Sequence, residues 1–381
     1  MPSETEAKPD LPPFACTFSP SMPALLWQLG VSIAISTYQA GKVIFMSATS
    51  PERMIQVARD FPSAMGLAQN GRRMAVATIN DVVVLANSPE LAPTFPPKPN
   101  TYDALFLPRA SYYTGQMNVH DMAWGTRGLW VVNTRMSCLC LVDDEFNFRP
   151  MWMPPFVTEL DPNDRCHFNG MALDGEPRYA TAFCPGNRKG AWRDYDTTKV
   201  GLLMEVPSGR VILDGLCRPH SPRLHRGQLY VCNSGAGEVL KVDPAAGTFE
   251  VIARVPGWAR GVAFHGDYMF IGLSKMREAR GDGPRDLPVL KEATHSGVVV
   301  LDLRTNRLVA ELKYLSSVEQ IYDLLVVPAR RPNILNEANQ ERRLALATPN
   351  DTFWGRMEDK KKKEGGDGDG DGGPDKGQAG S

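Results

Sequence analysis

The chain has 381 residues, with 42 Lys and Arg against 43 Asp and Glu, a formal net charge of −1. This balance argues against a protein that binds nucleic acid through bulk positive charge. Hydrophobic residues make up 43% of the sequence, which excludes a wholly disordered chain. The 34 glycines and 31 prolines favour many turns over long helices.

The sequence carries no sign of secretion or membrane insertion. Its first ten residues, MPSETEAKPD, are polar and lack the apolar centre of a signal peptide. No apolar run approaches the ~20 residues that a membrane-spanning helix needs. The seven cysteines are an odd number in a long chain, so a disulfide framework is not expected. We therefore expect a cytoplasmic protein with no membrane and no nucleic-acid partner.

In chain order, residues 1–14 are expected to form a disordered tail and residues 15–352 a single domain. The segment SMPALLWQL (21–29) predicts a short helix capped by Ser21, because a serine and an early proline are typical of a helix start. Residues 33–48 then predict two strands joined by an Ala-Gly turn. After residue 353 the sequence is low in complexity and predicts a disordered tail over 353–381.

A longer motif recurs through the middle of the chain. Each copy has an apolar strand, a glycine turn and a second apolar strand that ends in Asn, Thr or Ser. The copies start at Met65, His120, Asn169, His220 and Arg260. Two further strands follow, as in 238–243 with 249–255. Four short antiparallel strands in every ~40–50 residues are typical of a β-propeller blade.

The two ends of the domain predict how the ring closes. Residues 33–48 resemble the second and third strands of a blade but have no first strand before them. Residues 318–327, VEQIYDLLVV, resemble a first strand with no blade after it. Pairing the two completes a blade and removes a free sheet edge. We expect an all-β, six-bladed β-propeller closed by pairing the C-terminal strand with the N-terminal blade; seven blades are the alternative.

This topology predicts a functional face. The first strand of each blade starts at one mouth of the central channel, where Gln320 and Glu319 join the five motif starts. The second strand ends at the same mouth. Four long insertions, 89–118, 152–166, 184–199 and 275–296, are expected to emerge there as well. Because loops on a rigid scaffold often carry function, we expect a ligand site at this mouth.

Three histidines are candidate ligands for a divalent metal at the mouth: His120, His167 and His220. Asp121 and Glu319 are candidate catalytic acids or bases, because each lies beside a position at the mouth. The alternative interpretation is that these side chains are polar channel-lining groups bonded to water and backbone.

Four further residues are candidates for binding a substrate: Asn133, Asn169, Asn233 and Arg260. His167 lies two residues before Asn169, so both would point to the same side of an extended strand. Arg260, together with Arg165, would favour a carboxylate or phosphate ligand.

A resemblance to a known family rests on seven motifs that occur in order: STYQAGK (36–42), HDMAWG (120–125), LWVVNTRMSCLC (129–140), DRCHFNGMA (164–172), PHSPR (219–223), SGAGE (234–238) and GLSKMRE (272–278). They resemble a mainly bacterial family of conserved hypothetical proteins, a domain of unknown function. The resemblance covers roughly residues 15–350 and implies no activity, substrate or catalytic residue. At the level of fold, the chain is also similar to gluconolactonase and regucalcin-type propellers, which bind a divalent metal in the channel and open sugar lactones.

The sequence leaves three functions open. The first is a metal-assisted hydrolase or isomerase acting on a small polar substrate at the channel mouth. The second is a non-catalytic propeller that binds a protein or peptide through its loop face, with Tyr102, Tyr112, Tyr113, Trp152 and Phe156 as anchors. The third is a structural platform. Whether the protein is an enzyme is not decided by the sequence.

Overall fold

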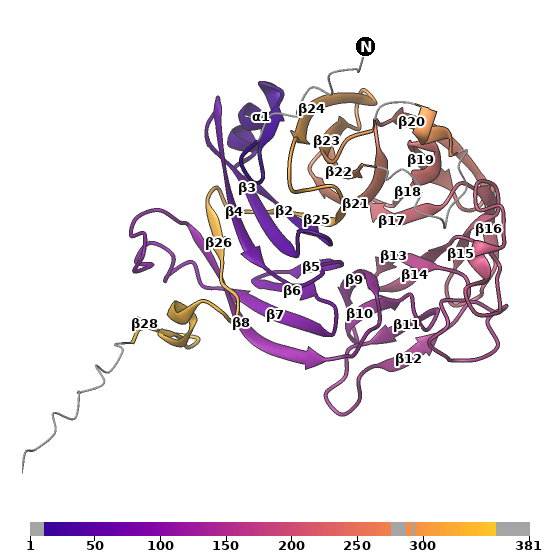
Figure 1. Cartoon of the computed structure of the whole chain (residues 1–381), viewed down its shortest axis with the longest axis horizontal. Helices are drawn as coiled ribbons and strands as arrows, with labels where there is room; N and C mark the ends of the chain where they lie inside the picture. Colours follow the sequence, from indigo (N-terminus) through magenta and orange to yellow (C-terminus); the bar gives the residue numbers. More distant parts are fainter. Residues whose placement is uncertain (1–10, 276–286, 292–293, 356–381) are drawn as a thin grey trace, which may run out of the picture.

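The computed structural model describes residues 11–275, 287–291 and 294–355. Six small antiparallel sheets surround a central axis, which confirms the six-bladed β-propeller (Figure 1). Each blade has four strands ordered from the axis outward, and two blades carry an additional outer strand.

The blades are numbered from the one that closes the ring. Their strands, from the axis outward, are as follows. Blade 1 contains β25 (Ile321–Val327), β2 (Ser32–Thr37), β3 (Lys42–Ser50) and β4 (Arg53–Asp60); blade 2 contains β5 (Leu67–Asn70), β6 (Arg73–Ala77), β7 (Asp81–Asn87) and β8 (Ala104–Tyr113); blade 3 contains β9 (Val119–Gly125), β10 (Gly128–Asn133), β11 (Cys138–Leu141) and β12 (Arg149–Trp152). Blade 4 contains β13 (Phe168–Asp174), β14 (Glu176–Ala182), β15 (Gly201–Glu205) and β16 (Val211–Leu216); blade 5 contains β17 (Pro219–His225), β18 (Gln228–Asn233), β19 (Glu238–Asp243) and β20 (Thr248–Arg254); blade 6 contains β21 (Trp258–His265), β22 (Tyr268–Ser274), β23 (Gly297–Asp302) and β24 (Arg307–Tyr314).

The ring closes as the sequence predicts. β25, from the C-terminal part of the domain, is the innermost strand of blade 1 and pairs antiparallel with β2, with Ser32 opposite Val327. Apolar side chains fill the spaces between the blades. Phe45 of blade 1, for example, packs against Phe106 of blade 2 with ring centroids 5.7 Å apart. Burial of these central strands on both faces explains their continuous apolar sequences.

Hydroxyl groups at the ends of second strands connect neighbouring blades. Thr134 donates to the carbonyl oxygen of Phe168 at 2.6 Å, from blade 3 to blade 4. Ser234 donates to the carbonyl oxygen of Ala259 at 2.6 Å, from blade 5 to blade 6. Ser36 and Ser274 make equivalent bonds to the carbonyl oxygens of Met65 and Ile321. This role explains why the motif often ends in a hydroxyl residue, since the buried carbonyl groups need a donor.

Elements outside the ring extend it at its edges. β1 (Cys16–Phe18) pairs antiparallel with β24, and β26 (Pro332–Ile334) pairs parallel with β8. The hairpin of β27 (Ala345–Ala347) and β28 (Thr352–Trp354) ends just beyond the boundary predicted at 353. Residues 1–10 and 356–381 of the two predicted tails lie outside the described residues.

Two local predictions need correction. The short helix α1 (Ser21–Leu29) exists, but its N-cap is Pro20 and no side chain caps it, so Ser21 is its first residue. The segment 89–118 is not one insertion, because it contains β8, the fourth strand of blade 2. No helix in the described part of the chain is long and apolar enough to cross a membrane.

Candidate functional site

A pocket of about 420 Å³ lies at the channel mouth where the sequence predicts a functional face. This volume is within the range of ~300–1,000 Å³ typical of small-molecule sites. All six blades contribute to its wall. The lining residues are Tyr38, Met65, Asn118, His120, Asp164, His167, Phe183, Trp192, Arg193, Arg218, His220, Trp258, Arg260, Ser274, Lys275, Gln320 and Tyr322.

Four of the nine candidate site residues line this pocket: His120, His167, His220 and Arg260. The other five, Asp121, Asn133, Asn169, Asn233 and Glu319, do not line it. Glu319 is exposed, and its carboxylate accepts a hydrogen bond from Gln39 at 3.4 Å. Its neighbour Gln320 is the residue that faces the pocket.

The three asparagines turn back into the scaffold. Asn133 accepts a hydrogen bond from the Met136 amide at 3.0 Å, and Asn233 accepts one from the Cys217 amide at 2.7 Å. Asn169 is buried and accepts a hydrogen bond from Thr181 at 2.7 Å. Asn169 does not share a side with His167, because His167 has φ +49° and the extended alternation is broken there. These amides stabilise turns and strand ends at the mouth.

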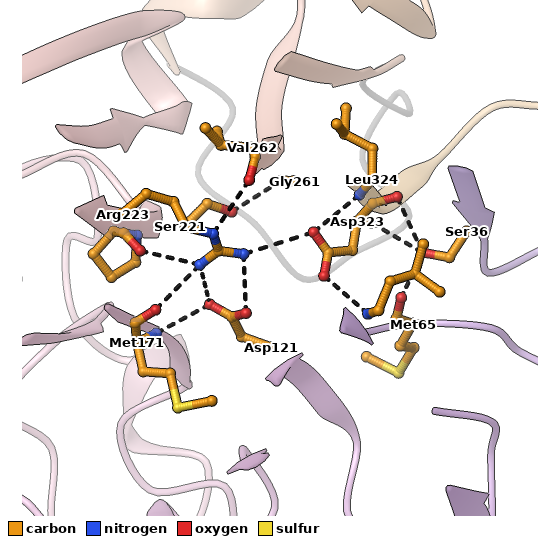
Figure 2. Close-up of polar contacts among 12 residues, drawn as sticks. Ser36, Met65, Asp121, Met171, Ser221, Arg223, Gly261, Val262, Asp323 and Leu324 are labelled. Carbon is orange, nitrogen blue, oxygen red and sulfur yellow. Dashed lines mark hydrogen bonds and ion pairs between the residues drawn. The ribbon is translucent and has the colours of Figure 1, made fainter. Parts of the chain in front are cut away.

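Asp121 belongs to a buried ion cluster that lies along the inner strands, one to three residues beyond the pocket positions. Arg223 lies between Asp121 and Asp323 (Figure 2). Its two terminal nitrogens donate to the two carboxylate oxygens of Asp121 at 2.6 and 3.0 Å. The ion pair with Asp323 is longer, at 3.7 Å. The carboxylates raise the pKa of Arg223 although burial alone would lower it.

This cluster contacts the innermost strand of every blade. Arg223 of β17 also donates to the carbonyl oxygens of Met171 in β13 and Val262 in β21. Asp323 of β25 accepts from the Leu67 amide of β5 at 2.9 Å, and Asp121 is on β9. Burial raises the pKa of Asp323 to about 7, although the charge of Arg223 opposes this shift. We call the three side chains Asp121, Arg223 and Asp323 the hub; they tie the six blades together at the axis.

A glycine lets the backbone approach the hub. Gly261 has φ +73°, a region that L side chains rarely adopt. A Cβ atom there would lie 2.7 Å from the Cα atom of Asp323. The small residue after Arg260 in the motif therefore has a specific packing reason.

Two histidines of the pocket are held in equivalent ways. The Nδ1 atom of His120 lies 3.0 Å from the Asn118 carbonyl oxygen and 2.8 Å from the Thr134 hydroxyl. The Nδ1 atom of His220 lies 3.0 Å from both the Arg218 carbonyl oxygen and the Ser234 hydroxyl. A carbonyl oxygen only accepts, so we assign the proton to Nδ1 in both rings. Nε2 is then the unprotonated nitrogen that a ligand can reach.

Both of these rings are uncharged at neutral pH. Burial is the main cause that lowers the pKa of His120 to about 3, and the charges of the nearby His167 and Arg260 contribute to the same shift. Burial and the charge of Arg260 also lower the pKa of His220 well below its usual value. Neutral imidazoles in this tautomer act as hydrogen-bond acceptors or proton acceptors through Nε2.

His167 has a carboxylate partner instead. Its Nδ1 atom lies 3.1 Å from Asp164, and Trp192 donates to the same carboxylate oxygen at 2.8 Å. Burial would raise the pKa of Asp164, but His167 and the two hydrogen bonds lower it, so the carboxylate is ionised. An ionised carboxylate bonded to Nδ1 fixes the ring and directs Nε2 as the reactive nitrogen.

Aromatic rings surround the histidines. The ring of His167 lies 4.9 Å from His120, 4.4 Å from Phe183 and 4.7 Å from Trp192, measured between centroids. Phe183 in turn lies 5.2 Å from His220. Phe183 thus contacts both His167 and His220. The pocket wall is a nearly continuous series of flat rings, suited to the planar or apolar part of a ligand.

The donor geometry does not supply a complete metal site. Among the residues that the structure describes, no group of three or more His, Cys, Asp or Glu side chains could hold a metal ion. Two of the three predicted ligands, His120 and His167, are neighbours, but the described residues do not complete a coordination sphere. The three histidines do not form such a group among the described residues, and metal binding by them stays a prediction.

Comparison with known proteins places the chain in a family. A family described as a domain of unknown function (DUF4915) matches residues 20–335. The chain belongs to this family. The match confirms the resemblance found in the sequence motifs, and it includes all six blades of the DUF4915 propeller and every pocket residue. A search of curated proteins gives no match.

The DUF4915 propeller is also similar to a chain in the crystal structure of a nidogen/laminin complex. The two share 12% sequence identity with a TM-score of 0.51, over 78% of this chain and 98% of that one. At this identity the likeness shows the fold alone.

Several residues that line the pocket of the DUF4915 propeller are not among the site residues predicted from the sequence. Asp164 lies in the insertion 152–166 and Trp192 in the insertion 184–199, whereas Arg218 and Trp258 each precede a motif start by two residues. Asp164 lies in the DRCHFNGMA motif, three residues before His167, and this spacing is the one signal that could have identified it. The insertion 184–199 is expected at the mouth from the sequence, but no spacing in it identifies Trp192, and Arg218 and Trp258 carry no such signal either.

Proposed function

We propose that the pocket at the channel mouth binds a small polar substrate and carries out acid–base chemistry on it, as a hydrolase or an isomerase. The observation that supports this most directly is the shared orientation of three imidazoles. Each uses Nδ1 to contact a fixed acceptor, which leaves Nε2 for a ligand. A merely structural histidine has no need to keep one nitrogen available in a pocket.

In this proposal His167 is the general base, because Asp164 holds its ring and balances the positive charge that forms when Nε2 accepts a proton. For hydrolysis, Nε2 takes a proton from water while the water oxygen bonds to the substrate carbonyl carbon, and the proton then passes to the departing oxygen. For isomerisation, Nε2 removes a proton from one substrate atom and returns it to another. His120 and His220, uncharged, would accept hydrogen bonds from substrate hydroxyl groups.

Metal assistance is not part of this mechanism, because the described donors do not complete a site. Elemental analysis of protein purified without chelator tests that decision. We expect no stoichiometric metal in the wild type; one equivalent that disappears in a folded His120→Ala, His220→Ala double variant would restore the metal hypothesis.

Activity is tested with a panel of lactones, esters and small phosphorylated or carboxylated compounds. We expect His167→Gln to lower turnover of any accepted substrate by about 10²–10⁴-fold, the usual contribution of a general base. The matched control is His225→Gln, since His225 lies at the opposite end of β17, where its Nε2 atom donates to the Gly266 carbonyl oxygen at 2.9 Å, and does not line the pocket. Equal turnover in the two variants would rule out His167 as the base.

A second candidate function is binding of a protein or peptide through the loop face. Tyr102 is buried in the core and cannot serve as an anchor as it stands, but Tyr113 is 77% exposed. It lines a groove together with Phe146, which is 60% exposed, and with Asp144 and Glu145, between the end of β8 and the β11–β12 turn and apart from the channel mouth. Aromatic groups with acidic neighbours favour a basic peptide. If this is the function, a Tyr113→Ala, Phe146→Ala variant should lose a partner that the His167→Gln variant retains.

The compartment remains part of the proposal. All seven cysteines are unpaired, and six of them are buried. Free thiols in a folded protein fit the reducing cytoplasm that we infer from the sequence.

A further inference from the structure

The charges around the pocket point to the nature of its ligand. Four cationic side chains line it: Arg193, Arg218, Arg260 and Lys275. Asp164 is the one carboxylate among the described lining residues, and it already accepts bonds from His167 and Trp192. The whole chain carries a net charge of only −1, so this excess of positive charge is local to the pocket.

Arg260 is buried without a carboxylate partner among the described residues. Its side chain is 8% exposed, its Nε atom donates to the Ile321 carbonyl oxygen at 2.9 Å, and its guanidinium carbon lies 3.5 Å from the ring centroid of Tyr322. These contacts hold the guanidinium group over the ring but do not neutralise its charge. Burial accordingly lowers the pKa of Arg260.

Arg218, at the start of the neighbouring blade, is also buried without a carboxylate partner among the described residues. It is 9% exposed, and its Nε atom donates to the Thr197 hydroxyl at 2.7 Å. Its guanidinium carbon lies 5.6 Å from the ring centroid of Phe183 and 6.0 Å from that of Trp258. Neutral partners again fix the side chain, and no described carboxylate pairs with it.

Two other arginines with little exposure, Arg165 and Arg223, are paired with acids. Arg165, at 7% exposure, forms ion pairs with Asp161 and Glu159, so it does not serve the pocket as the sequence suggested. Arg223 pairs with both acids of the hub. Buried charges are normally compensated in this way because desolvation is costly. An arginine left uncompensated in a pocket wall is therefore suited to an anion that arrives with the ligand.

We infer that the ligand is an organic anion whose carboxylate or phosphate group is bound by Arg218 and Arg260, while its body lies against the aromatic wall. This inference rests on the proposed function, since it names the substrate class of the same pocket. Arginine can bind a carboxylate or a phosphate through two parallel hydrogen bonds. The experiment therefore uses probes that distinguish the two groups.

The probes are chosen as pairs that differ in charge and little in shape. Benzoate and benzamide test the carboxylate, and phenyl phosphate tests the phosphate. Binding is measured by NMR titration of the ¹³C- and ¹⁵N-labelled full chain, observing the ring signals of His120 and His220 because both line the pocket. We expect at least one anion to bind ten- to a hundred-fold more tightly than benzamide, the usual gain from a charged hydrogen bond in a buried site.

Variants assign the preference to the arginines. Arg260→Gln and, separately, Arg218→Gln should bring the affinity for the anion down to that for benzamide. Arg260→Lys keeps the charge and should retain part of the preference. The matched control is Arg304→Gln, since Arg304 lies outside the pocket and pairs with Asp302. The thermal midpoint of each variant shows that it is folded.

The outcomes separate the two proposals. If benzamide binds as tightly as the anions and perturbs the same histidines, the pocket is a ligand site but the anionic class is wrong. The same conclusion follows if the anions keep their advantage in both folded glutamine variants. If no probe perturbs His120 or His220, both the anion and the small-molecule site are contradicted. A preference for phenyl phosphate over benzoate, or the reverse, identifies the anionic group.

Discussion

The hub and the pocket are neighbours along the inner strands, and both contain arginine side chains with little exposure. The two regions differ in the partners that they give to these arginines. Arg223 of the hub meets two carboxylates and several carbonyl oxygens. Arg218 and Arg260 of the pocket each meet one neutral acceptor and aromatic rings. The first arrangement is complete within the protein, and the second is not. We infer that the hub stabilises the ring, whereas the pocket keeps buried charges that lower the stability of the fold but are available to bind a ligand.

The largest expected effect comes from breaking the hub. Arg223→Met leaves two buried carboxylates without a counter-charge, and it should lower the free energy of unfolding by about 3–5 kcal/mol. Arg260→Met removes an uncompensated buried charge and should change it by less than ~1 kcal/mol, or raise it. Denaturant unfolding of both variants measures the difference. Equal losses would show that the two arginines play the same structural role.

A pH titration of stability sharpens the comparison further. The pKa of His120 is about 3 in the folded chain and ordinarily 6.5, so between these values the unfolded chain binds a proton that the folded chain does not. Stability therefore falls as the pH drops through this window, and at pH 5 His120 alone should cost about 2 kcal/mol relative to pH 7.

The hub titrates in the opposite sense. The pKa of Asp323 is raised to about 7, so between about pH 4 and 7 the folded chain keeps a proton that the unfolded chain releases. Its contribution to the free energy of unfolding therefore decreases as the pH rises through this range. Comparing the wild type with His120→Gln cancels this contribution, since both keep Asp323. The assignment of a neutral His120 predicts that the free energy of unfolding decreases more in the wild type than in His120→Gln when the pH is lowered from 7 to 5. A decrease that is no larger in the wild type would contradict it.

A smaller effect is expected from the bond that joins blade 3 to blade 4. Thr134→Val keeps the side-chain shape but removes the hydroxyl shared by the Phe168 carbonyl oxygen and His120, and should cost about 1–2 kcal/mol of unfolding free energy. Thr248→Val, at an exposed site on β20, is the control and should cost less than about 0.5 kcal/mol. If the two losses match, the hydroxyl does not support the pocket wall.

The smallest effect belongs to surface ion pairs. Arg72 and Glu90 lie 2.8 Å apart with both side chains at least half exposed. Solvent screens such pairs, so Arg72→Gln should change the unfolding free energy by less than about 0.5 kcal/mol. A loss comparable to that of Arg223→Met would mean that pairing, rather than burial, sets the value of an arginine in this fold.

The fold was predictable because its signals are local and repeated. The motif starts set the blade spacing, and the incomplete blades at residues 33–48 and 318–327 identified the closure that β2 and β25 make. The segment 89–118 was misread, since a fourth strand with a proline and polar residues has a weak alternation pattern. β8 is buried over its first four residues, where β26 pairs with it, and more exposed beyond them, so no single burial pattern runs through its sequence.

The pocket was predictable only in part. His120, His220 and Arg260 lie in it because motif starts share one mouth, and this follows from topology alone. Asp121 lies in the hub and not in the pocket, because successive residues of a strand face opposite sides. The neighbour of the pocket residue His120 therefore points away from the pocket. Asn133 and Asn233 accept hydrogen bonds from backbone amides and Asn169 accepts one from the Thr181 hydroxyl, so their carbonyl oxygens are engaged within the scaffold. Arg218 and Trp192 required the tertiary structure.

The closing strand makes the site a late product of synthesis. Tyr322 and Asp323 lie on β25, whereas β2, with which it pairs, was made near the start of the chain. Neither the support for Arg260 nor the second acid of the hub exists until almost the whole domain has left the ribosome. Occupancy of the pocket would therefore report that β25 has paired with β2 and the ring is closed, and a fragment that stops short of β25 should be unable to retain a ligand.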